Sequence, residues 1–240
     1  MSVTFPRLVG VLALVWLPVL QRGLLDWPSD TAWAAFLVGW LAVAGCLLTG
    51  RAIRGAGIGL AGLATVLILG VAPQLASASA LWIWMGVILA VTEGRAGERA
   101  LLVRTLVTAV YLFAALSKLN PSFLAGEQLR ALVIDREHWA SLVPVMESTA
   151  GLVLSWVAVA IEALIPVGLW WSPTRRIAVA VAIPFHVVLI VIAFQGTVHD
   201  LAYITVLNLL LVAGIYAFFQ PIDAALTYDR TRRTPGRDVA

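Results

Sequence analysis

Seven polar side chains lie within or at the ends of otherwise apolar runs, and their types allow acid–base chemistry. A charge at membrane depth costs from about 2.5 kcal/mol upward, so the charges that remain there are candidates for function. These candidates are Tyr111, Lys118, Glu162, His186, His199, Asp200 and Asn208. We expect Lys118, Glu162 and His186 to be catalytic residues, and we expect the other four to contact a ligand.

Lys118 is the only lysine in a chain that otherwise uses arginine, fifteen times. Arginine is not deprotonated in proteins, whereas a lysine amine can lose its proton and act as a base or a nucleophile. Tyr111, Ala115 and Lys118 share one helix face, and Asn120-Pro121 then ends the helix. The alternative is a snorkelling lysine that stabilises a helix C-terminus by charge alone.

Glu162 and His186 each lie near the middle of an apolar run and close to a proline, Pro166 and Pro184 respectively. A proline inside a helix leaves the carbonyl four residues earlier without its usual donor. Two interpretations stay open on spacing alone. The two side chains hold helices in register by bonding to each other or to these carbonyls, or they form an acid and a base near a ligand.

Apolar runs recur along the whole chain and predict the elements that position these residues. Of the 240 residues 61% are hydrophobic and only 12% are charged, and the mean hydropathy is +0.96. A helix needs about 20 apolar residues to cross a bilayer, and helices satisfy their own backbone groups in lipid. We therefore expect an all-α polytopic bundle of about eight transmembrane helices, at residues 7–21, 31–49, 56–72, 79–92, 100–119, 149–171, 177–194 and 201–219.

The distribution of basic residues predicts the orientation of this bundle. Eight spans place twelve of the sixteen basic residues on one side of the membrane. The positive-inside rule makes that side the cytoplasm, with both termini in it and Lys118 outside. We expect residues 1–227 to form one transmembrane domain in a bacterial cytoplasmic membrane, with short interfacial helices in an outer loop at 120–148 and a basic, disordered cytoplasmic tail at 228–240.

Several other classes of site are not expected. The single cysteine, Cys46, lies in an apolar run, and the sequence has no zinc-ligand spacing and no phosphate-binding glycine loop. The arginines punctuate the ends of apolar runs instead of forming a patch, so the bilayer explains the net charge of +3 better than nucleic acid does. No metal and no nucleic-acid partner are predicted.

Residues 111–129 carry a motif: a tyrosine-led helix, the pair Lys118-Leu119, and the turn Phe123-Leu124-Ala125-Gly126. This motif resembles the signature of the vitamin K-dependent γ-carboxylase-like membrane domain, also called the horizontally transferred transmembrane (HTTM) domain. Glu162, Pro166 and His186 resemble residues of the later helices of that family. The resemblance extends over roughly residues 7–219.

The resemblance implies that Lys118 is a base for a reduced quinone of the vitamin K or menaquinol type. It thus implies quinone-linked oxidation or carboxylation-type chemistry, with a quinone and a membrane or extracytoplasmic protein as partners. Only 21 residues follow the last predicted span, so we do not expect this chain alone to carboxylate peptide glutamates. The alternative function is a non-enzymatic membrane subunit, assembly factor or immunity-type partner protein.

Overall fold

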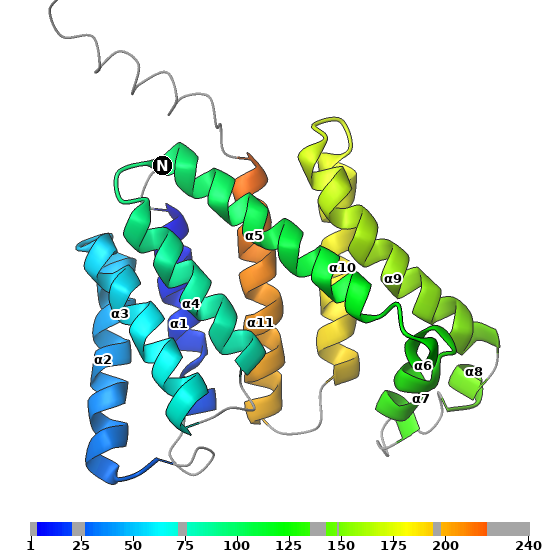
Figure 1. The fold of residues 1–240 in the computed structure, drawn as a ribbon, viewed down its shortest axis with the longest axis horizontal. Helices are drawn as coiled ribbons and strands as arrows, with labels where there is room; N and C mark the ends of the chain where they lie inside the picture. Colours follow the sequence, from blue (N-terminus) through cyan, green and yellow to red (C-terminus); the bar gives the residue numbers. More distant parts are fainter. Residues whose placement is uncertain are drawn as a thin grey trace, which may run out of the picture. The chain divides into compact units, whose positions relative to one another are not determined.

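The computed structural model describes residues 4–20, 27–71, 76–134, 143–147, 149–193 and 198–219, and all regular structure in these ranges is helical (Figure 1). The predicted tail at 228–240 lies outside them. The helices are α1 (Thr4–Val15), η1 (Leu17–Leu20), α2 (Asp30–Thr49), α3 (Ile53–Val66), the π-helical η3 (Leu67–Val71), α4 (Ala76–Val91), α5 (Ala96–Ser117), α6 (Pro121–Leu124), α7 (Glu127–Ile134), α8 (Val143–Glu147), α9 (Thr149–Trp170), α10 (Arg175–Ala193), α11 (Val198–Tyr216) and η6 (Ala217–Phe219).

A helix lies at each of the eight positions where a span is expected, but the count of eight membrane crossings is not confirmed. In the part of the chain that the structure describes, three helices are long and apolar enough to cross a bilayer, namely α2, α5 and α9. The apolar parts of α1, α3, α4 and α11 are shorter. Short helices were expected within 120–148, and α6, α7 and α8 lie there.

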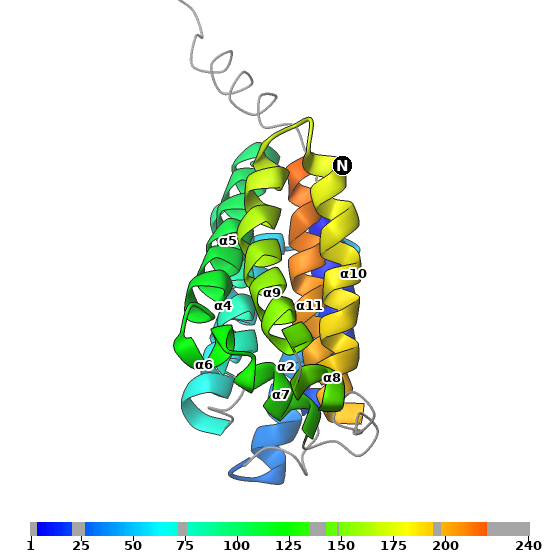
Figure 2. The same cartoon turned by 90° about the vertical axis from the view of Figure 1, so that its right-hand side faces the viewer.

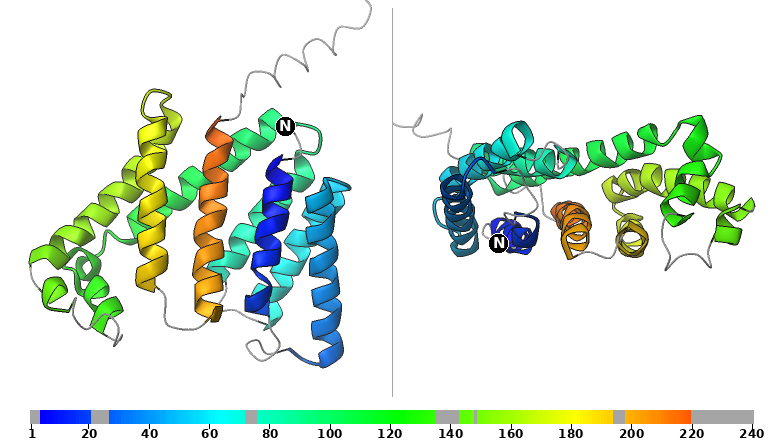
Figure 3. Two further views of the ribbon diagram at one scale, coloured as in Figure 1. Left: turned by 180° about the vertical axis from the view of Figure 1, so that it is seen from behind. Right: turned by 90° about the horizontal axis from the view of Figure 1, so that it is seen from below.

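The chain divides into two compact units, which we describe separately. Unit 1 comprises Met1–Thr105 and Leu209–Ala240, and unit 2 comprises Leu106–Asn208. Within unit 1, α1 packs beside α2, and α3 packs beside α4 (Figures 1 and 3). The last pair approach closely where Gly57 faces Gly86, since a Cβ on either glycine would lie 2.6 Å from the other's carbonyl oxygen. Small residues permit such contacts between apolar helices.

Aromatic rings form much of the core of unit 1. The Trp82 ring makes edge-to-face contacts with the rings of Trp16 and Trp40, at centroid distances of 6.1 and 5.6 Å. All three are fully buried. The indole nitrogen of Trp40 also donates to the carbonyl of Ala13 over 2.8 Å. These contacts connect α2 and α4 to the end of α1.

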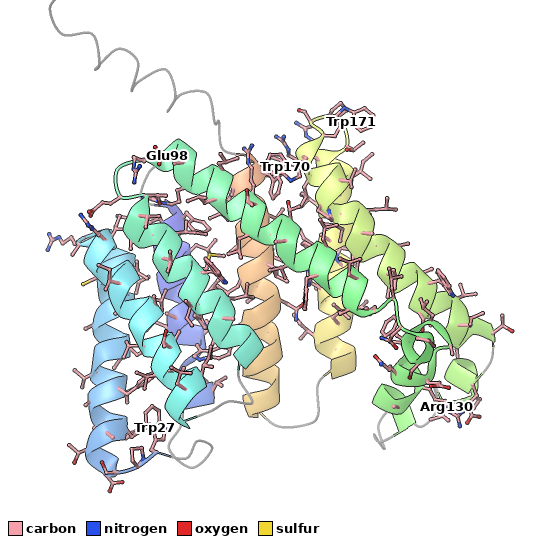
Figure 4. The ribbon with its side chains drawn as sticks, in the orientation of Figure 1. Trp27, Glu98, Arg130, Trp170 and Trp171 are labelled. Carbon is pink, nitrogen blue, oxygen red and sulfur yellow. The ribbon has the colours of Figure 1, made fainter. Side chains whose placement is uncertain are left out.

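In unit 2, α9 and α10 form an antiparallel pair, and α6, α7 and α8 gather near the start of α9 (Figures 1 and 2). The pair is tight at Gly168, where a Cβ would lie 2.9 Å from that of Ala178. Trp170 and Trp171 mark the turn between the two helices, whereas Arg130 marks the opposite end, where it pairs with Glu147 over 2.8 Å (Figure 4). This unit holds the described candidate residues.

Candidate functional site

Lys118 lies in a short break between two helices whose ends are bonded to each other. Helix α5 ends at Ser117, and Asn120 caps α6 by accepting a bond of 2.9 Å from the backbone N–H of Phe123. The amide of Asn120 donates back to the carbonyl of Ser117 over 2.9 Å. Asparagine before a proline at the first helical position is a favoured helix start. The break is therefore a fixed corner.

The Lys118 ammonium turns from this corner onto Glu162 of α9. Its Nζ donates to both carboxylate oxygens, over 2.9 and 2.7 Å. It also lies 5.8 Å from the ring centroid of Phe123, a distance typical of a cation–π contact. The exposed fractions of the two paired side chains are 26% for Lys118 and 6% for Glu162. Lys118 is thus the ion-pair partner of a carboxylate whose side chain is more deeply buried than its own.

Glu162 belongs to a stripe of buried residues along one face of α9. This stripe comprises Gly151, Ser155, Val159, Glu162, Ile165, Pro166 and Leu169. Gly126, which ends the turn after α6, packs onto the first of them. Its φ of 85° is a left-handed conformation that glycine adopts at low cost. The turn that follows Lys118 is therefore held against the same helix that carries Glu162.

A second cluster joins the parts of α5, α10 and α11 that belong to unit 2. Nδ1 of His186 lies 2.5 Å from Oδ1 of Asn208, and Nε2 bonds to the hydroxyl of Tyr111. Because an amide oxygen only accepts, Nδ1 carries the proton in a neutral imidazole, and Nε2 then accepts from the Tyr111 hydroxyl. All three side chains are buried. Both ring nitrogens of His186 are thereby engaged with protein groups.

The two clusters lie along one face of α5. Tyr111 and Lys118 are seven residues apart, about two helical turns. Glu162 and His186 therefore have different partners, and a bond between these two side chains, which the first interpretation allowed, is not present. Of the five candidates in the two clusters, Lys118 is the one that is not buried.

His199 and Asp200 are placed by the structure only as backbone near the start of α11, and their side chains lie outside the described residues. Their expected contact with a ligand stays a prediction.

Sequence reasoning missed two residues that build the site. Asn120 was expected only to end α5, although asparagine before proline is also an N-cap pattern. Gly151 was not singled out, although Gly151 and Ser155 form a small-x-x-x-small pair of the kind that lets membrane helices approach closely. Both signals are local and could have been used.

Comparison with known proteins identifies one family. The HTTM domain model matches residues 98–214, a segment that contains every candidate residue named above. Neither the curated proteins nor the solved structures include a match. The match is shorter than the expected 7–219, but it covers the motif of residues 111–129 and the later helices. With its long apolar helices, the chain is a membrane protein, and its segment 98–214 matches the HTTM domain family.

Proposed function

We propose that the HTTM domain of this chain is a quinone-linked membrane enzyme in which Lys118 transfers a proton from the hydroxyl of a reduced quinone. One observation carries the proposal: the only lysine of the chain is paired, inside the family-matched segment, with a buried carboxylate. An amine beside a carboxylate is a common arrangement for general acid–base catalysis, because either of the two adjacent groups can hold the proton.

The partial exposure of Lys118 supports a ligand at this position. Its side chain is about a quarter exposed, whereas that of Glu162 is buried. A reduced quinone would supply two electrons and two hydroxyl protons for oxidation chemistry. Lys118 would bind the hydroxyl, and Glu162 would hold the amine in place.

His186 takes a positioning role in this proposal. Since its two nitrogens bond to Tyr111 and Asn208, it acts on the site through Tyr111 and not by touching the ligand. Tyr111 in turn lies on α5, seven residues before Lys118. The three residues would fix the rotation of α5 and hence the direction in which Lys118 points.

The proposed location is the bacterial cytoplasmic membrane, with multiple crossings and both termini in the cytoplasm. The loop at 120–148 and Lys118 would then face outward. This placement is supported by the sidedness of the arginines and would let a ligand dissolved in the bilayer reach the amine from the outer boundary of the lipid.

Turnover in lipid nanodiscs tests the function. Oxidation of a reduced naphthoquinone by dissolved oxygen would be followed by absorbance for the wild type, Lys118→Met and Lys118→Arg. Loss of the base should lower turnover by about 100-fold or more in both variants, since arginine keeps the charge but cannot exchange a proton. Arg130→Met, which removes an exposed ion pair with Glu147, is the matched control and should leave turnover unchanged. Undiminished turnover of Lys118→Arg would contradict the proton-transfer role.

Lipids that co-purify with the protein identify the ligand class. Mass spectrometry of a mild-detergent preparation should find a quinone in the wild type. A stoichiometric protein partner without any quinone would instead favour the non-enzymatic alternative.

A further inference from the structure

We infer that Glu162 takes up the net proton that the ligand gives up, by a relay in which Lys118 passes one of its own protons to Glu162 and then accepts the hydroxyl proton of the ligand. This inference rests on the proposed function, which requires only that Lys118 exchange a proton. It assigns Glu162 a catalytic step in addition to holding the amine.

The resting geometry requires an acceptor behind the lysine. The Lys118 Nζ donates to two carboxylate oxygens at 2.7 and 2.9 Å, and an ammonium group has no lone pair. It must therefore lose a proton before it can accept one. Its other acceptor among the described residues is the backbone carbonyl of Ala114 at 3.5 Å. A peptide carbonyl is too weak a base to take up a proton in water near neutral pH. The Glu162 carboxylate is the group that can.

The difference in burial indicates which of the two side chains is more accessible to a ligand. The Lys118 side chain is 26% exposed, whereas that of Glu162 is 6% exposed and lies on the buried stripe of α9. Of the two side chains, that of Lys118 is therefore the one more open to a ligand. The carboxylate lies behind it, within hydrogen-bond distance of the amine, so a proton reaches Glu162 by way of Lys118.

The step balances without an added reactant. One N–H bond of the Lys118 ammonium breaks while an O–H bond forms on Glu162, which leaves a neutral amine and a neutral carboxyl. The lone pair of the amine then takes the hydroxyl proton of the ligand, and the electron pair of that O–H bond stays on the ligand oxygen. The result is an ammonium at Lys118, a protonated Glu162 and an anionic ligand.

The charge rearrangement keeps the Lys118 ammonium paired with an anion before and after the step. Before the step, the ammonium is neutralised by Glu162. After it, Glu162 is neutral, and the full positive charge of Lys118 faces the new anion across a short distance, where attraction is strong in a medium of low dielectric. The ion pair between Lys118 and Glu162 is thus replaced by an ion pair between Lys118 and the ligand anion.

Infrared difference spectroscopy tests the inference directly. Adding a reduced naphthoquinone to the wild type in nanodiscs should produce the carbonyl stretch of a protonated carboxyl group, which shifts in D2O. The band should be absent in Glu162→Gln and displaced in Glu162→Asp. Turnover should fall by about 100-fold or more in Glu162→Gln and be partly retained in Glu162→Asp. Melting temperatures of both variants would verify that they are folded.

The outcomes separate this inference from the proposed function. If Lys118→Met turns over normally, the proposed function fails. If Lys118→Met is inactive but Glu162→Gln retains wild-type turnover, the function stands and this inference is wrong, because the free amine would then suffice. A wild type that turns over without any carboxyl band would also overturn it, and this measurement needs no variant to fold.

Discussion

Gly126 lies against the backbone of Gly151, where a Cβ atom would stand 3.1 Å from the Gly151 carbonyl carbon. This contact explains the end of the Phe-Leu-x-Gly turn in the family-like motif. The glycine is needed twice, for its positive φ and for the close approach to α9. The motif is therefore a docking element that brings Lys118 to the helix of Glu162.

Gly126→Ala should lower the free energy of unfolding by about 1–3 kcal/mol, because a side chain there is strained in its backbone and crowds α9. Denaturant or thermal unfolding in detergent measures the change. Gly62→Ala is the matched control, since nothing lies within 4 Å of its Cβ position and alanine favours a helix. Equal stability of the two variants would contradict the docking role.

Removing both members of the Lys118–Glu162 pair should cost less stability than removing one. Lys118→Met leaves a buried carboxylate without its cation, which should lower the free energy of unfolding by about 3 kcal/mol. The double variant Lys118→Met with Glu162→Leu should lie nearer the wild type. A double-mutant cycle with a coupling energy close to zero would show that the ion pair does not contribute.

The hydrogen bonds of His186 predict its tautomer. Nitrogen-15 NMR should find the proton on Nδ1 in the wild type, since Oδ1 of Asn208 accepts it. Asn208→Leu should remove that preference and cost about 1–3 kcal/mol, because a buried N–H loses its acceptor. Asn208→Asp keeps an acceptor and should retain the tautomer. A proton on Nε2 in the wild type would reverse the direction assigned to the Tyr111 bond.

Arg104 should stabilise the end of unit 1 formed by η6. Its guanidinium is buried and donates to the carbonyls of Ala217 and Phe218, over 3.0 and 3.3 Å. Arg104→Met leaves these carbonyls without that donor, so amide exchange in the last turns of α11 should accelerate and stability should fall by about 1–3 kcal/mol. Arg176→Met, at an exposed position, is the control.

Hydropathy and proline positions predicted where the helices lie, but not which of them cross the membrane. The residue types of the site were also readable, because a glutamate or a histidine inside an apolar run is conspicuous. The sequence did not show which of these residues pair with each other. Helix α9 carries large apolar residues on every side, so apart from Gly151 and Ser155 its sequence gives little indication of which face packs against α5. Without that rotation, Glu162 could have been assigned to His186 as easily as to Lys118.

The motif contacts α9 at two points that are separated by a defined distance along that helix. Gly126 contacts Gly151 and Lys118 contacts Glu162, so one short segment touches α9 at two points eleven residues apart, about 16 Å along the axis. The spacing of Gly151 and Glu162 along α9 therefore has to match the spacing of Gly126 and Lys118 in the motif.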